Sequence, residues 1–440
     1  MQHDDIDEPA DPGVNTEAAS DARRPGPRNR LRRLVHPHRR TVVRMVLALL
    51  AVIVVLAVVG GSIRAFSRHE EPGVDPSALI GLTPTWSADL GQGKVVGMAF
   101  EADRLYASSA QGLTVFDIPC DGDGEPCRPS WLGVVPDGPI SAPVVSGDSV
   151  YAGSSSGQVY AFPATCDANG CPPRWVGVAG KGRVSRPGVN DDFVYVTSDR
   201  LYAFPAACGS ADRTCLPAWT APLPDAPTGD APAVGGGVVV VASDSVEGGV
   251  SAFPAVCTEG CEPLWTGETD GPATGVTVEG DTAYVVAHGS LLAFPLSCQG
   301  VCHPTWTGTF VPGGAFAEGS PAPPGVGSGQ VAIAGDDGTL WLFPATCPNP
   351  TCGPLRSFDL GAEGLGRPVI EEGFVFVASE DGRVFAIGTG CDPSNVTTCD
   401  EAATISLGGP TRAVPASGAG AVYMGDDAGT VHAFDLRASG

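Results

Sequence analysis

The sequence predicts an all-β fold, an eight-bladed β-propeller closed by its own terminal strands, and three observations support this prediction. A strand-end landmark, in most copies Ala-Phe, recurs eight times at intervals of 41 to 49 residues. A pair of cysteines follows each of the first seven landmarks. Glycine and proline number 60 and 41 in 440 residues, a composition that suits short strands joined by tight turns.

Each copy of the repeat contains four strand signals. In one copy these are a short segment at Trp131 and apolar segments at 140–145, 150–153 and 158–163, with Gly-Asp and Ser-Gly turns between the last three. Four strands in 40 to 50 residues are typical of a propeller blade. Helical solenoids have a similar period, but glycine, proline and β-branched residues at this density would break their helices. The landmarks are Phe116, Phe162, Phe204, Phe253, Phe294, Phe343, Ile387 and Phe434.

The mismatch between eight landmarks and seven cysteine pairs predicts how the ring closes. Each pair spans the connection from one copy's Phe strand to the next copy's Trp strand. The Trp86 strand has no such connection before it, and the Phe434 strand is followed only by the last residues of the chain. We therefore predict that the Trp86 strand completes the blade formed by about 412–436. The propeller then occupies residues 85–436, and its eighth seam is non-covalent.

All fourteen cysteines are predicted to form disulfides within these pairs. None has the C-x-x-C spacing of zinc or haem motifs, and an oxidising space outside the membrane favours disulfides. We expect each to staple one hairpin, with Phe162 facing Trp175, and to contribute about 2 kcal/mol. Reduction should then fray blade edges before it opens the ring. The predicted pairs are Cys120–Cys127, Cys166–Cys171, Cys208–Cys215, Cys257–Cys261, Cys298–Cys302, Cys347–Cys352 and Cys391–Cys399.

The N-terminal part of the chain predicts a single membrane anchor. Met45–Ile63 is an uncharged apolar run whose helical length, roughly 28 Å, matches a bilayer core. An arginine-rich segment precedes it, so the positive-inside rule leaves 1–40 as a disordered cytoplasmic tail and the propeller outside the cytoplasm. We therefore expect a signal-anchor helix at 41–63 and a linker at 64–84. A cleaved signal peptide is the alternative, but the run exceeds the usual apolar core of such peptides.

Charge limits the classes of partner. The formal net charge is −24, and residues 45–440 hold 16 basic and 42 acidic side chains. Because a surface of this sign repels a phosphate backbone, nucleic-acid binding is disfavoured. Basic proteins or divalent cations would suit it better, although solubility alone is the plainer explanation.

Three segments carry a resemblance to a known family: GDSVYAGSSSGQVYAFPA, EGFVFVASEDGRVFAIGT and AGAVYMGDDAGTVHAFDL. They resemble the PQQ-like repeat of quinoprotein-type β-propellers, over residues 85–436. That family includes dehydrogenases that bind pyrroloquinoline quinone, and scaffolds such as the propeller lipoprotein of the outer-membrane β-barrel assembly machinery. This chain lacks the adjacent Cys-Cys pair of methanol-dehydrogenase-like members and has little loop sequence beyond its blades. The resemblance therefore implies the scaffold branch.

Residue patterns predict no catalytic, cofactor-binding or metal site. The Asp-rich segments at 336–338, 380–382 and 426–427 have the chemistry of tight turns rather than of calcium ligands. His288 and His432 are interpreted as packed or surface residues, because no Ser/His/Asp pattern accompanies them. Two longer loops, Val311–Pro324 and Ser243–Gly249, break the repeat and are expected to carry a partner site.

The predicted function is a membrane-anchored, extracytoplasmic scaffold in the bacterial cell envelope that binds a protein and is not an enzyme. One alternative is a dehydrogenase dependent on pyrroloquinoline quinone, which would need calcium and a polar pocket at the ring centre. Another is a sensor that passes an external signal through the anchor. The short tail, without a kinase-like or DNA-binding pattern, makes the sensor less favoured.

Overall fold

The structure is a computed structural model. It describes residues 83–436 except 92, 121–126, 137, 168–169, 210–212, 224–226, 228–229, 244–248, 259, 311–321, 372 and 391–402. The predicted tail, the helix at 41–63, most of the linker and the pair Cys391–Cys399 lie outside these residues. Within them, no helix is long and apolar enough to cross a membrane.

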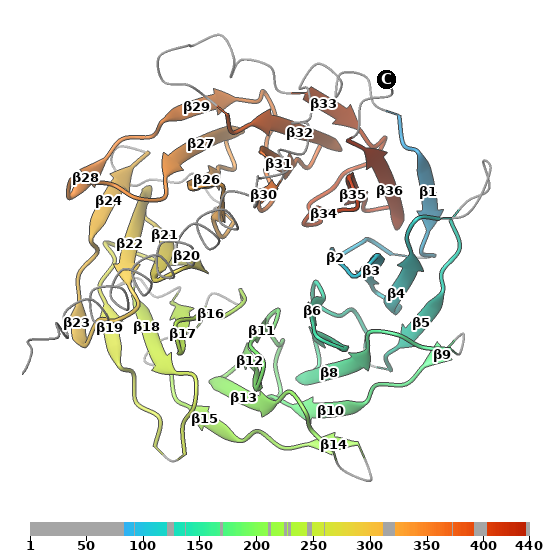
Figure 1. The fold of residues 1–440 in the computed structure, drawn as a ribbon, viewed down its shortest axis with the longest axis horizontal. Helices are drawn as coiled ribbons and strands as arrows, with labels where there is room; N and C mark the ends of the chain where they lie inside the picture. Colours follow the sequence, from blue (N-terminus) through green and yellow to red (C-terminus); the bar gives the residue numbers. More distant parts are fainter. Residues whose placement is uncertain are drawn as a thin grey trace, which may run out of the picture. The chain divides into compact units, whose positions relative to one another are not determined.

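Eight sheets follow one another around a ring (Figure 1). The first four blades comprise β2 (Gly97–Glu101), β3 (Arg104–Ser109), β4 (Gly112–Asp117) and β5 (Trp131–Val134); β6 (Val144–Ser146), β7 (Ser149–Gly153), β8 (Gln158–Pro163) and β10 (Trp175–Val178); β11 (Gly188–Val189), β12 (Phe193–Thr197), β13 (Leu201–Pro205) and β15 (Trp219–Ala221); and β16 (Ala233–Gly235), β17 (Val238–Ala242), β18 (Val250–Pro254) and β19 (Trp265–Gly267).

Blades 5 to 8 repeat the same order. They comprise β20 (Ala273–Glu279), β21 (Thr282–Ala287), β22 (Ser290–Pro295) and β24 (Trp306–Thr309); β25 (Gly325–Gly327), β26 (Gln330–Ala334), β27 (Thr339–Pro344) and β29 (Arg356–Asp359); β30 (Val369–Glu371), β31 (Phe374–Ala378), β32 (Arg383–Gly388) and β33 (Ala403–Ser406); and β34 (Ala416–Gly418), β35 (Ala421–Gly425), β36 (Thr430–Asp435) and β1 (Trp86–Asp89). The predicted eight-bladed all-β fold is confirmed.

The terminal strands close the ring as the cysteine count predicts. Strand β1 pairs antiparallel with β36, with Trp86 opposite Ala433 and Asp89 opposite Thr430. Blade 8 therefore takes its outer strand from the N-terminal end of the propeller and its other three strands from the C-terminal end (Figure 1). The eighth seam is thus closed by strand pairing, which makes it non-covalent as expected.

Burial follows the position of a strand within its blade. Every residue of β7 is buried, because the middle strands of a blade lie between two neighbouring blades. The outer strand β5 instead alternates, with Trp131 and Gly133 buried and with Leu132 and Val134 exposed. Valine, tyrosine and phenylalanine suit the middle strands because they pack well against both neighbouring sheets.

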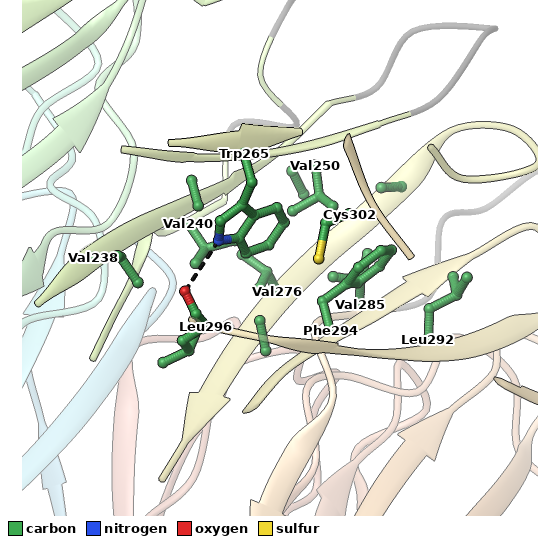
Figure 2. Close-up of a cluster of buried hydrophobic side chains, with 14 of the residues drawn as sticks. Val238, Val240, Val250, Trp265, Val276, Val285, Leu292, Phe294, Leu296 and Cys302 are labelled. Carbon is green, nitrogen blue, oxygen red and sulfur yellow. Dashed lines mark hydrogen bonds between the residues drawn. The ribbon is translucent and has the colours of Figure 1, made fainter. Parts of the chain in front are cut away.

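Tryptophans of the outer strands pack against a phenylalanine of the next blade rather than against that of their own hairpin. The Trp175 ring of blade 2 lies 5.9 Å from the Phe204 ring of blade 3. Trp265 and Phe294 of blades 4 and 5 are 5.8 Å apart, in the same cluster as Cys302 (Figure 2). The prediction that Phe162 faces Trp175 is wrong, because Trp175 pairs with Ala161. Trp175 does pack against a landmark phenylalanine, but that residue is Phe204 of the next blade.

A glycine two residues after the tryptophan makes this packing possible. A Cβ atom at Gly177 would lie 2.5 Å from Cε1 of Phe204, and one at Gly267 would lie 2.6 Å from Cε1 of Phe294. Real Cβ atoms do not approach a ring so closely, so a side chain at these positions would push the blades apart. The W-x-G pattern is therefore a packing signal, in which glycine leaves room for the next blade's phenylalanine.

Polar tips of the aromatic residues bond across the same seams. The indole Nε1 of Trp265 donates to the Leu296 carbonyl at 3.2 Å (Figure 2). The Tyr195 hydroxyl donates to the Ala255 carbonyl at 2.8 Å, while in the same blade Nε1 of Trp219 has no partner among the described residues. Buried tyrosine and tryptophan thus fix neighbouring blades by hydrogen bonds as well as by contact area.

Six disulfides lie in the described residues, with Cα–Cα distances of 5.5 to 6.4 Å. Four of their second cysteines end short strands that pair parallel with the outer strand of the preceding blade. In one, Cys171 on β9 lies opposite Gly133 on β5. Each disulfide joins two cysteines of one hairpin connection, as predicted, and in these four the second cysteine also lies on a strand that pairs with the preceding blade. The four strands are β9 (Gly170–Cys171), β14 (Thr214–Cys215), β23 (Gly300–Cys302) and β28 (Thr351–Cys352).

A Cys166→Ser/Cys171→Ser double variant tests this seam role. Loss of the short covalent loop is expected to lower the free energy of unfolding by about 2 kcal/mol. Hydrogen exchange should then rise in β5 of blade 1, because β9 is no longer held against it. Exchange that rises only at the ends of β8 and β10 would support the hairpin-staple expectation instead.

Candidate functional site

The strand register identifies one equivalent position per blade at the ring axis. In every blade the third residue of the second strand pairs with one residue of the inner strand. The equivalent position at the axis lies two residues before that inner-strand residue. Neighbouring members touch: a Cβ at Gly97 would lie 2.4 Å from Cβ of Ala142, and one at Gly275 would lie 2.5 Å from Cγ of Pro323. This axial ring consists of Gly97, Ala142, Arg186, Ala231, Gly275, Pro323, Arg367 and Val414.

Two arginines stand out in this ring of small or apolar residues. Arg186 belongs to blade 3 and Arg367 to blade 7, so in a ring of eight they lie on opposite sides of the axis. Both line a central cavity of about 390 Å³ and a second chamber of about 280 Å³. Burial, aided by the charge of Arg367, lowers the pKa of Arg186 to about 10, so this guanidinium group stays charged at neutral pH. Burial also lowers the pKa of Arg367, and Asp230 opposes that shift.

Asp230 is a carboxylate that lines the same central cavity and interacts electrostatically with both arginines. Burial raises its pKa to about 6, although Arg367, Arg183 and Arg186 all favour its ionised form. Arg367 is held in place by donating from Nη2 to Oγ1 of Thr277 at 3.1 Å. The Nε atom of Arg186 is buried and has no hydrogen-bond partner among the described residues.

A third cavity, of about 290 Å³, adjoins the central one. It is lined by Lys94 and shares Arg183 and Arg412 with the central cavity. Arg412 also forms an ion pair with Glu380. Basic side chains therefore gather in the two adjoining cavities, although the chain from residue 45 onward carries 42 acidic and only 16 basic residues.

Sequence reasoning missed the arginine pair, although a signal was present. The dipeptide Arg-Pro occurs at 186–187 and again at 367–368, each directly before the inner strand of its copy. The two copies are four repeats apart, which in an eight-membered ring means opposite positions. Only an alignment of all eight inner strands would have shown that both arginines occupy the axial ring.

A second feature lies on the outer rim. In blades 1 and 2 the outward positions of the outer strand hold Leu132, Val134 and Val178, which are 42%, 62% and 58% exposed. We call these three residues the apolar rim patch. The equivalent positions of the other six blades hold threonine, serine, aspartate, glutamate or proline. Exposed large apolar residues on an outer strand therefore occur in two adjacent blades, whereas the other exposed large apolar residues lie in the connections between the third and outer strands of a blade: Leu216, Val256, Val301 and Leu355.

The expectation that no Ser/His/Asp group accompanies His432 is wrong, because the closed ring places Ser87 and Asp426 against its two ring nitrogens. Ser87 Oγ lies 2.9 Å from Nδ1 of His432, whose Nε2 lies 3.2 Å from Oδ2 of Asp426. Asp426 also accepts a hydrogen bond from the amide of Thr430 at 2.7 Å. The group joins β1, β36 and the turn before β36, so it ties the closing strand to its blade.

The Asp-rich segments form turns, as predicted. The amide of Thr339 donates to Asp337 Oδ1 at 3.0 Å, and Gly338 adopts φ of +84°. No group of three or more metal-ligating side chains occurs among the described residues. His288 lies in a turn with φ of +45°. Loop residues 311–321 and 244–248, predicted to carry a partner site, fall outside the described residues.

Comparison with solved structures identifies propellers of the same architecture. A computationally designed protein, Ika8, superposes with a TM-score of 0.61 at 11% identity over 81% of this chain and 99% of its own. BamB from Moraxella catarrhalis gives 0.56 at 18% over 80% and 97%, and Sqt1 from Saccharomyces cerevisiae gives 0.62 at 8% over 81% and 99%. No protein-family description and no curated protein matches the sequence. The chain is thus similar in fold to designed and natural β-propellers.

Proposed function

We propose that the chain is a membrane-anchored scaffold of the cell envelope that binds a partner protein through its outer rim, and that it is a binding protein rather than an enzyme. The apolar rim patch carries this proposal. Six blades place polar side chains or, at one position, proline at the outward positions, so the fold itself does not require large aliphatic residues there. Exposed apolar side chains on neighbouring elements are typical of protein-interaction surfaces.

Two further features support the proposal. The fold is similar to that of BamB, and the repeat resemblance of this chain implies the scaffold branch of the PQQ-like repeat family. The predicted helix at 41–63 would hold the propeller at the membrane, where an envelope partner is within reach. The acidic surface would limit non-specific association between copies while leaving the apolar patch as the point of contact.

A photo-crosslinking amino acid at position 134 of the full-length chain tests the rim patch directly. We expect it to give one discrete protein adduct in intact cells. A Leu132→Thr/Val178→Thr change in the same chain should reduce this adduct at least tenfold, because two aliphatic contacts are lost. Threonine is the residue that most other blades carry at the first outward position, so the fold should be unaffected.

The matched control is the same photo-crosslinker at position 309, the equivalent outward position of blade 5. It should give no such adduct. Equal labelling from positions 134 and 309, or an adduct at 134 that survives the threonine changes, would contradict a binding role for the patch.

A further inference from the structure

We propose that the centre of the ring is a binding site for a small oxyanion, held between Arg186 and Arg367 on the axis. This inference is independent of the rim patch and concerns a different surface of the propeller. The ligand class is a small molecule with carboxylate, sulfate or phosphate oxygens, which two guanidinium groups can bind from opposite sides.

Placement on the axis is the first step of the argument. Six of the eight axial residues are glycine, alanine, proline or valine, so they leave the axis open. Arg186 and Arg367 occupy the two remaining positions, on blades that face each other. Both line the two chambers on the axis, which have volumes of about 390 and 280 Å³. A site of this size holds a small molecule rather than a macromolecule.

The second step is the hydrogen-bond balance. Arg367 uses Nη2 to reach Thr277, while the buried Nε of Arg186 has no partner among the described residues. A buried charged donor without a partner is costly, and an oxyanion with several acceptor oxygens would satisfy it. Guanidinium groups bind such anions through two parallel hydrogen bonds, which explains arginine rather than lysine here.

The third step is the charge of the surroundings. The central cavity is lined by four arginines and by two carboxyl groups, those of Asp230 and Asp336. The adjoining cavity adds Lys94 and Asp427 and shares Arg183 and Arg412 with the central one. Arginine side chains thus outnumber carboxyl groups in the central cavity, although the chain as a whole is acidic. A local field of this kind attracts an anion and draws it toward the axis.

The balance of charge also gives the site a pH dependence. Asp230 competes with the ligand for the arginines while it is ionised, and burial raises its pKa to about 6. As the pH falls through that value, Asp230 takes up a proton and frees the arginines for the ligand. The charged groups around Asp230 in the cavity are Arg183, Arg186, Arg367, Arg412 and Asp336.

Titration calorimetry of the full-length protein with sodium sulfate tests the site, since sulfate keeps its charge between pH 5 and 8. Ionic strength is held constant with sodium chloride. We expect saturable one-to-one binding that is about tenfold tighter at pH 5 than at pH 7.5. Sodium succinate in a second series separates a dicarboxylate ligand from a tetrahedral anion: tighter binding of one probe assigns the ligand to that class.

Variants at the axis distinguish binding from a structural role. Arg186→Gln and Arg367→Gln should each weaken binding roughly 10- to 100-fold, the loss expected for charge-assisted hydrogen bonds. Arg200→Gln, at an exposed residue, should leave it unchanged. Asp230→Asn should tighten binding at pH 7.5 and remove the pH dependence, a gain that misfolding cannot produce. Absence of binding for both probes, or equal affinity in the glutamine variants, would overturn the proposal.

Discussion

A Gly177→Val variant is expected to lose about 3 kcal/mol of unfolding free energy, because its side chain would enter the seam between blades 2 and 3. The Cβ atom alone would lie 2.5 Å from Cε1 of Phe204, whose ring already contacts Trp175. Neither ring has room to move, since both are buried. Valine is otherwise favourable in strands, so the loss would come from the seam and not from the strand itself.

Chemical denaturation of the full-length protein measures this effect. The matched control is Gly170→Val, on strand β9, where an added Cβ meets no atom within 4 Å. That change should alter stability by no more than about 0.5 kcal/mol. A Gly177→Val protein as stable as the control would show that the phenylalanine seams tolerate extra volume, contrary to the packing described for W-x-G.

Ring closure is the second point at which one residue should have a large effect. Ala88→Asp is expected to destabilise the propeller by about 3 kcal/mol or more, because it buries an unpaired carboxylate. Ala88 is 4% exposed and belongs to a core cluster with Phe116 of blade 1 and Val431 of blade 8. No covalent bond holds this seam, so β1 would detach from β36. Limited proteolysis within 85–90 should then become rapid.

Thr404→Asp provides the control for charge alone. Thr404 lies at the first outward, exposed position of β33, and at the next outward position two other blades already carry Asp89 and Asp359. It should leave both the unfolding midpoint and the proteolysis pattern unchanged. Slow cleavage of Ala88→Asp within 85–90, at the rate of the unsubstituted chain, would mean that β1 contributes little to holding the ring.

The number of blades and the closure could be predicted because each depends on chain order alone. The landmarks count the copies, and the missing eighth cysteine pair shows that Trp86 and Phe434 lie at a junction without a connecting loop. Neither inference requires knowledge of which side chains are in contact. Tight turns at Asp-Gly were predictable for the same reason, since their chemistry is local.

Contacts between copies were harder to predict. The spacing of Phe162 and Trp175 is compatible with a pair in one hairpin and with packing across a seam. In four blades the glycine two residues after the tryptophan, which leaves room for the next blade's phenylalanine ring, decides between them. The axial arginines and the Ser87–His432–Asp426 group depend on residues brought together by the closed ring. The spacing of residue pairs in the sequence therefore could not reveal them, whereas the strand register in the structure does.

The pairing of β1 with β36 has a consequence for synthesis of the chain. Ser87 and His432 are 345 residues apart, and translation at about 5 to 20 residues per second separates them by roughly 17 to 70 s. During that interval the first strand has no partner, while blades 1 to 7 can assemble in order as they emerge. The nascent protein must therefore keep this segment from pairing elsewhere until its last strand arrives.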